Sequence, residues 1–480
     1  MEHTLLAISA MDGRYADKVD HLSQYFSEAA LMRYRCLVEV EWFLFLFNEA
    51  KLKGTVELKV ADIKMLRGIY EQFDVVDAQR VKTIEKVTNH DVKAIEYFIK
   101  EKIKGSALEK YQEFIHFCCT SEDINNLSYA CMIRDYLERD YMTVLSGLVQ
   151  ELYEKAQDYK AVPMLSRTHG QPASPTTLGK ELINFVVRLE KEMEILSMNS
   201  SLPGKINGAV GNYNAHFVTY GEVDWLALSK EFVESLGLKF NQYTTQIEPH
   251  DGFAVVFDSV KRINNICLDF SRDMWTYISL GYFDQKIMKG EVGSSTMPHK
   301  VNPIDFENAE GNLGLANALF EHMSSKLQIS RMQRDLSDST VQRNIGVAFA
   351  YCSLSYKALI KGLFKCEINE KLIKEDLQDK WELLAEPIQM MMRKNKIEKS
   401  YELLKELTRG KKGITKDVVA KFIAKLKIPV ADKKILSSLT PEKYIGIAAK
   451  LVETYELKIS ASSQGCGSGG GCGGGCNGCG

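Results

Sequence analysis

The sequence predicts an all-α protein with a bundle of long helices at its centre, and three observations support this class. Ten prolines occur in 480 residues, with none before Pro163 and none between Pro303 and Pro387. An interior proline breaks a helix, so these gaps leave room for long helices. Apolar residues recur at steps of three or four from Val256 to Ile278, which marks one continuous helical face. Strand signals are sparse, and no βαβ alternation indicates a parallel sheet.

The same patterns place the individual elements in order. We expect long helices at Ala30–Asn48, Asp123–Tyr159, Thr177–Ser197, around 256–278, at Gly311–Leu327 and around Thr340–Leu363. A lysine-rich stretch from Glu96 to Lys110 indicates the end of an N-terminal domain, and short lysine-rich helical segments follow Leu363. The sequence therefore predicts an N-terminal helical domain (1–110), a central long-helix bundle (111–365), a small C-terminal helical domain (366–461) and a flexible Gly/Cys-rich tail (462–480).

Composition narrows the class of protein. Lys and Arg number 61 against 63 Asp and Glu, a net charge of −2, which lacks the basic excess that nucleic acids or anionic membranes require. Apolar runs such as Trp42–Phe47 fall far short of the roughly 18 residues that span a bilayer. The first residues lack the pattern of a signal peptide. We therefore expect a soluble cytoplasmic protein with no nucleic-acid and no membrane partner.

The eleven cysteines fall into two sets. Seven lie in the body of the chain among apolar neighbours, which is typical of reduced, buried thiols. The other four lie in the Gly-rich stretch 464–480. Thiolates prefer soft metals such as Zn²⁺ or Cu⁺, but the spacing matches no structural zinc pattern. The tail is therefore either a soft-metal ligand or a neutral or added extension.

Three polar segments interrupt the helical patterns. In SRTHGQP (166–172) small and polar residues flank His169, which suits a loop that presents an imidazole, although a lone histidine is more often structural. In the segment 293–308, Gly-Ser-Ser and two prolines suit a loop that closes over a substrate and aims amides at an oxyanion, or a simple linker. In the segment 331–343, arginines and hydroxyls suit a phosphate or carboxylate, or a solvated face.

Several motifs together resemble one known family. GSSTMPHKVNP (293–303) is similar to the signature GSSxMPxKxNP of the fumarase/aspartase superfamily. Within it, the chain resembles the bacterial adenylosuccinate lyases through these further segments: VTNHDVKA (87–94), TSEDINN (120–126), SRTHGQP (166–172), KINGAVGNYNAH (205–216) and TTQIEPHD (244–251). The resemblance covers residues 1–460 and leaves out the tail.

The resemblance implies both an architecture and an activity. It implies three all-α domains whose central helices form a core shared by a homotetramer, with each active site built from three subunits. The implied enzyme is a C–N lyase of purine nucleotide biosynthesis without a cofactor or a catalytic metal. It would release fumarate by β-elimination from two small molecules, adenylosuccinate, which leaves AMP, and SAICAR, which leaves AICAR.

The resemblance also implies roles for single residues. Ser294 would be the general base and His169 the general acid, with Lys300 stabilising the serine alkoxide and Glu307 pairing with the histidine. The substrate-binding residues would be Arg14, Tyr15, Asn89, His90, Asp91, Thr120, Ser121, Gln246, Ser295, Asn302, Asn308, Arg334, Ser339, Thr340 and Arg343. Among these, Arg334, Ser339 and Arg343 would bind the nucleotide phosphate.

Two other functions fit the same scaffold. One is a different lyase of the superfamily, such as an argininosuccinate lyase or a fumarase, although a fumarase needs no phosphate site and the segment 331–343 is rich in arginine. The other is a non-catalytic structural protein, which the presence of both His169 and Ser294 disfavours.

Overall fold

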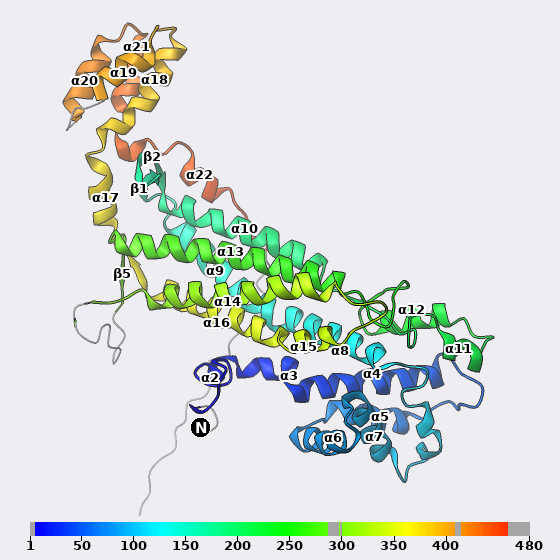
Figure 1. Ribbon diagram of the computed structural model, residues 1–480. Helices are drawn as coiled ribbons and strands as arrows, with labels where there is room; N and C mark the ends of the chain where they lie inside the picture. The colour runs from blue at the N-terminus through cyan, green and yellow to red at the C-terminus, as the bar shows by residue number, and fades with distance from the viewer. Residues whose placement is uncertain (1–4, 287–296, 298–299, 409–413, 459–480) are drawn as a thin grey trace, which may run out of the picture.

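The computed structural model describes residues 5–286, 297, 300–408 and 414–458. Five long helices lie side by side and form the body of the molecule (Figure 1). They are α9 (Met142–Asp158), α10 (Leu178–Met198), α13 (Asp251–Ser279), α14 (Ile304–Leu327) and α16 (Ile345–Lys365). Helix α14 packs against both α13 and α16, and α10 packs against both α9 and α13. The predicted all-α class with a central long-helix bundle is confirmed, whereas the core shared by four subunits stays a prediction.

The N-terminal part is a group of helices below the bundle in Figure 1. It comprises α2 (Ala16–Val19), η1 (Asp20–Leu22), α3 (Ser23–Phe26), α4 (Glu28–Asn48), α5 (Val60–Glu71), α6 (Val75–Thr88), α7 (Asp91–Ile103) and η2 (Glu109–Phe114). Helix α4 begins where the Ser27 hydroxyl accepts the backbone N–H of Ala30, an ordinary N-cap. It is buried on nearly all sides because it lies between α5 and α8 (Ser121–Tyr136). A π-helical stretch, η3 (Leu137–Tyr141), joins α8 to α9 within the long helix predicted there.

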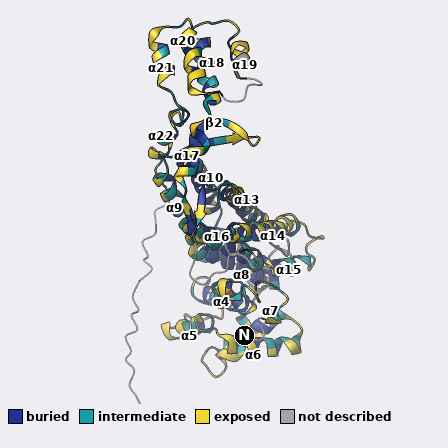
Figure 2. Ribbon diagram, turned by 90° about the vertical axis from the view of Figure 1, so that its left-hand side faces the viewer, coloured by how far each residue is buried: buried dark blue, intermediate teal, exposed yellow. Residues whose placement is uncertain are grey.

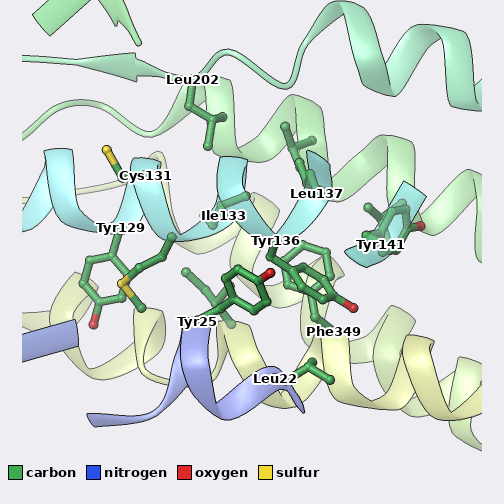
Figure 3. Close-up of a cluster of buried hydrophobic side chains, with 14 of the residues drawn as sticks. Leu22, Tyr25, Tyr129, Cys131, Ile133, Tyr136, Leu137, Tyr141, Leu202 and Phe349 are labelled. Carbon is green, nitrogen blue, oxygen red and sulfur yellow. The ribbon is translucent and has the colours of Figure 1, made fainter. Parts of the chain in front are cut away.

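Aromatic side chains tie the N-terminal helices to the bundle (Figure 3). The ring of Tyr136 on α8 lies edge-on to Tyr25 of α3 and to Phe349 of α16, with centroids 5.5 and 5.0 Å apart. Such pairs contribute roughly 0.5–1.5 kcal/mol beyond the burial of their area. One core therefore runs through the bundle and the helices below it.

The strands are short and occur in three separate pairs. β1 (Pro163–Thr168) and β2 (Gln171–Thr177) form an antiparallel hairpin, β3 (Pro203–Gly204) pairs in parallel with β4 (Lys239–Phe240), and β5 (Phe283–Gln285) pairs antiparallel with β6 (Cys366–Ile368). Three further helices are short: α11 (Asn214–Thr219), α12 (Trp225–Ser235) and α15 (Ser337–Gln342).

The C-terminal part has a small core of its own at one end of the molecule (Figures 1 and 2). Its elements are α17 (Glu370–Gln378), η4 (Trp381–Leu384), α18 (Ala385–Lys394), α19 (Ser400–Thr408), α20 (Lys416–Lys425), α21 (Val430–Ser438), η5 (Pro441–Lys443) and α22 (Ala448–Glu453). The small core extends from Leu384 to Leu436, whereas Ile373 and Val452 belong to the large core. Helix α22 thus returns to the bundle, where the Gln157 side chain donates to the carbonyl of Val452 over 3.0 Å.

Two local expectations need correction. Helix α14 begins at Ile304 and not near Gly311, because Pro303 occupies the N-cap position and requires no hydrogen bond there. The SRTHGQP segment is a β-hairpin and not an irregular loop. The predicted tail, residues 462–480, lies outside the described residues. Within the described ranges, no helix has the length and apolar character needed to cross a membrane.

Candidate active site

His169 stands at the tip of the β1–β2 hairpin. The last strand pair is Thr168 with Gln171, so His169 and Gly170 form a two-residue turn. Both have positive φ, +53° and +74°, as a turn that continues the twist of a hairpin requires. Glycine adopts this backbone without strain, whereas histidine adopts it at a cost, which is typical of functional positions. The turn leaves His169 exposed to solvent.

The hairpin is anchored near its tip by Arg167. Its guanidinium donates to the Tyr282 hydroxyl at 2.8 Å and pairs with the Asp376 carboxylate at 2.5 Å. Burial alone would raise the pKa of Asp376, but hydrogen bonds from Tyr282 and Arg167 outweigh it and lower that pKa. The hairpin is thereby fixed to α17 and to the segment before β5.

A second group of predicted residues gathers at the start of α14. The Asn308 amide donates to the Tyr15 hydroxyl at 3.3 Å, which joins the N-terminal turn to this helix. Glu307 accepts a hydrogen bond from the indole N–H of Trp275 at 3.1 Å rather than from His169. Lys300 is exposed just before the helix, and Asn302 is half-buried. The Arg14 guanidinium lies over the Tyr15 ring.

The predicted base, Ser294, and its neighbour Ser295 lie outside the described residues. Their roles therefore remain predictions.

A third group forms where α7 and α8 begin. His90 is the N-cap of α7, and its Nδ1 accepts the backbone N–H of Lys93 at 3.1 Å, which leaves the proton of the neutral ring on Nε2. Nε2 lies 3.5 Å from the Ser121 hydroxyl. Asn89 closes α6 in the left-handed conformation. Thr120 opens α8 in a capping box with Asp123. Helix ends thus hold His90 and Ser121 facing each other.

The predicted phosphate-binding arginines border this third group. Arg334 forms an ion pair with Glu122 at 2.9 Å and donates to Gln246 at 3.4 Å. Arg343 is mostly exposed, with its guanidinium 3.7 Å from the Asp91 carboxylate. Ser339 and Thr340 lie on the intervening helix α15.

Burial affects the pKa values of the two carboxylates beside these arginines. It raises the pKa of Glu122, although the charge of Arg334 partly counters the effect. Burial alone would also raise the pKa of Asp91, but the neighbouring Arg35 outweighs it and lowers that pKa.

Sequence patterns did not single out Glu122 or Arg35, which contact the predicted residues directly. A signal existed for Arg35, because it lies between Tyr34 and Cys36 on the largely apolar helix α4, although Glu28, Arg33, Glu39 and Glu41 share that helix. Such a position usually carries a buried partner.

The first and the third group lie apart within one chain. The β1–β2 hairpin projects from the end of the bundle that lies next to the small C-terminal core (Figures 1 and 2). Helices α7 and α15 and the start of α8 lie toward the opposite end. The described part of the chain also holds no group of three or more His, Cys, Asp or Glu side chains that could hold a metal ion. A single chain thus presents the expected acid and the expected nucleotide-binding side chains on distant surfaces.

Comparison with known proteins decides the family. A family described as "Lyase" matches residues 13–317, and one described as "Adenylosuccinate lyase C-terminal" matches residues 330–445. The chain is 53% identical over 451 residues to an adenylosuccinate lyase of Haemophilus influenzae, covering 94% of this chain and 98% of the relative. It belongs to the adenylosuccinate lyase family.

Other relatives agree. The adenylosuccinate lyase of Escherichia coli K12 is 51% identical over 456 residues, with 95% of this chain and 99% of the relative covered. The one from Legionella pneumophila strain Corby is 52% identical over 452 residues, with 94% and 99% covered. The family resemblance stated from the motifs is therefore confirmed over nearly the whole chain.

Solved structures share the fold. The crystal structure of a fumarate lyase from Mesorhizobium sp. BNC1 superposes with a TM-score of 0.72 at 16% identity, covering 90% of this chain and 96% of that one. A 3-carboxy-cis,cis-muconate lactonizing enzyme from Pseudomonas putida gives 0.70 at 17% identity, with 90% and 95% covered. The helical architecture of adenylosuccinate lyases is thus common to proteins of very different sequence.

Proposed function

We propose that the protein is an adenylosuccinate lyase that releases fumarate from adenylosuccinate, leaving AMP, and from SAICAR, leaving AICAR, in purine nucleotide biosynthesis. The observation that carries the proposal is the match to named adenylosuccinate lyases over at least 94% of the chain. The exposed His169 on a strained turn and the arginine-bordered group at α7 and α8 supply the acid and the anion-binding side chains that this reaction needs.

The elimination divides between a base and an acid. Ser294 removes the proton from the carbon beside the succinyl carboxylate, and the electron pair then breaks the C–N bond while His169 protonates the leaving nitrogen. A serine hydroxyl is a weak acid, so this role requires amide donors from its own loop and the charge of Lys300 nearby. Glu307 supports the protonated form of His169 once the hairpin of another subunit reaches it.

The remaining predicted residues bind the substrate. Ser295 and Asn302 hold the succinyl carboxylates together with Lys300, and Asn308 lies nearby. The nucleotide and succinyl pocket is lined by Arg14, Tyr15, Asn89, His90, Asp91, Thr120, Ser121 and Gln246. The nucleotide phosphate binds to Arg334, Ser339 and Arg343, because a guanidinium can form two parallel hydrogen bonds to phosphate oxygens. Thr340 is a further substrate-binding residue.

We also propose that the active enzyme is a homotetramer whose sites are shared between subunits. The separation of the His169 hairpin from the His90 group within one chain supports this arrangement. A cytoplasmic location completes the proposal. The seven free cysteines of the described residues are in keeping with a reducing compartment.

Turnover of adenylosuccinate by the purified protein tests the proposal. We expect fumarate and AMP from the wild type, followed by absorbance and chromatography, and about a hundredfold loss or more in Ser294→Ala. Ser438→Ala serves as the matched control, because Ser438 is exposed at the end of α21 and its hydroxyl donates to the carbonyl of Ile435, three residues before it. A tetrameric wild type without turnover would contradict the proposed activity, and full activity in Ser294→Ala would move the base elsewhere.

A further inference from the structure

Arg334 forms an ion pair with a buried carboxylate, that of Glu122. The Nη2 atom of Arg334 lies 2.9 Å from Oε1 of Glu122, and a second carboxylate, Asp338, lies 3.8 Å away. The Glu122 side chain is only 2% exposed, and that of Arg334 is 18% exposed. The guanidinium is therefore held in place before any anion arrives.

Asn125 extends this contact one helical turn along α8. Its amide N–H donates to Oε1 of Glu122 at 2.8 Å, and its amide oxygen accepts from Nε of Arg35 at 2.9 Å. The two ends of an asparagine amide differ, since one donates and the other accepts. A carboxylate on one side and a guanidinium on the other therefore fix its orientation.

Arg35 continues the chain of contacts to the second phosphate arginine. Its Nη2 donates to Oδ2 of Asp91 at 2.8 Å, and the same oxygen lies 3.7 Å from Nη2 of Arg343. The Arg35 side chain is 5% exposed. Its guanidinium thus uses one N–H for Asn125 and another for Asp91, in the fixed fork that only arginine provides.

A cavity of ≈ 250 Å³ opens beside these residues, and its walls include Arg35, Asp91 and Arg343. Arg35 thus lies at the wall of a hollow that reaches the exposed Arg343. From Arg334 to Arg343, guanidinium groups alternate with carboxylates, and the Asn125 amide stands between Glu122 and Arg35. A carboxylate therefore offsets the charge of each of the two phosphate-binding arginines before phosphate binds.

We infer that Arg35 is a positioning residue for nucleotide-phosphate binding, acting through Asn125 and Glu122 on Arg334 and through Asp91 on Arg343. We call Arg35, Asp91, Glu122 and Asn125 the α8 relay. The inference rests on the proposed function, in which both outer arginines bind the phosphate. Holding both guanidiniums in register beforehand reduces the ordering that phosphate binding would otherwise require.

The test is Arg35→Lys, which keeps the positive charge and removes the fork. We measure AMP and adenosine binding by calorimetry and turnover of adenylosuccinate and of its dephosphorylated nucleoside. We expect AMP affinity to fall and the KM for adenylosuccinate to rise by about tenfold, the effect of weakening one charge-assisted contact. Adenosine binding and turnover of the nucleoside should stay within about twofold, because neither involves the phosphate arginines.

Arg33→Lys is the matched control. Arg33 lies on the same helix, but its guanidinium donates to the carbonyl of Gln24 and covers the Tyr34 ring, away from the relay. It should leave all four quantities unchanged. Asn125→Ala and the double variant with Arg35→Lys give a second measurement, in which a relay predicts that the double variant loses no more phosphate affinity than the worse single variant.

The outcomes separate the inference from the proposed function. A wild type that neither binds AMP nor cleaves adenylosuccinate overturns both. If the wild type is active but Arg35→Lys weakens the binding of AMP and of adenosine equally, or weakens neither, the relay is overturned and the proposed function is not. If Arg35→Lys does not assemble, Asn125→Ala decides the matter by the same ratio of AMP to adenosine affinity.

Discussion

Lys205 and Asp123 form an ion pair that is entirely closed to solvent, with Nζ 2.9 Å from Oδ1 and neither side chain exposed. The same carboxylate accepts the backbone N–H groups of Thr120, Asn207 and Gly208 at 2.8, 2.9 and 3.1 Å. One buried aspartate thus fastens the segment 205–208 to the first turn of α8. The position of Thr120 and its neighbours in the candidate site depends on this connection.

Replacing Lys205 by methionine should destabilise the protein strongly. The change leaves the buried Asp123 charge without its cation, and breaking such a pair costs about 3–5 kcal/mol. Urea unfolding at fixed protein concentration measures the effect. Lys230→Met is the control, since Lys230 lies on the surface 3.9 Å from Glu234 and should change stability by less than about 0.5 kcal/mol. Equal midpoints for the two variants would contradict the argument.

Gly179→Ala should also destabilise the protein. Gly179 is the second residue of α10, and an added Cβ would lie 2.3 Å from the carbonyl oxygen of Ala156 and 2.6 Å from the backbone of Lys160. Backbone atoms cannot move aside, so we expect a loss of about 3 kcal/mol in urea unfolding. In Gly68→Ala, also within a helix, the nearest atom would be the Gln72 amide at 3.9 Å. The free energy of unfolding of that control should rise by up to about 1 kcal/mol. A similar loss of stability in both variants would contradict the steric explanation.

The sequence predicted the long helices because proline gaps and apolar periodicity are local signals. It missed the β1–β2 hairpin, whose strands contain Pro163, Pro172 and Pro175, residues that count against a strand. It also placed the start of α14 too late, because Gly-Ser-Ser and two prolines in the segment 293–308 indicate a loop. These errors lie where backbone geometry is set by tertiary contacts rather than by local preference.

The residues of the candidate site, like the elements of the fold, could be predicted from the sequence only in part. Motifs identified His169, His90 and the two outer arginines, because each belongs to a segment that resembles a known family. Arg35 lies outside those segments, and Asn125 lies within TSEDINN (120–126) without a predicted role, since their contact joins α4 to α8 and no sequence spacing encodes that pairing. Residues that meet only through packing require the folded chain to be recognised.

The stability of the protein should depend on pH through His116 and Glu39, whose ring and carboxylate lie 2.6 Å apart. Burial alone would lower the pKa of His116, but the Glu39 charge outweighs it and raises the pKa above 6.5. The stabilisation is therefore complete below that value and is lost as pH rises through the folded pKa. We expect the difference in unfolding free energy between wild type and His116→Gln to shrink as pH rises from about 6.5. Glu39→Gln should abolish this trend, and a difference that grows with pH would refute it.

Two inactive variants should restore each other if the active sites are shared. His169→Gln and Lys300→Met each remove one predicted catalytic group, so each homo-oligomer should be inactive. When the two chains are co-expressed with different affinity tags and isolated as mixed tetramers, a site that takes His169 from one subunit and Lys300 from another is intact in about a quarter of cases. The mixed enzyme should therefore show about a quarter of wild-type turnover, with intact sites of unchanged KM. If both residues act within one chain, every site in the mixture lacks one of them, and activity would stay at the level of the single variants.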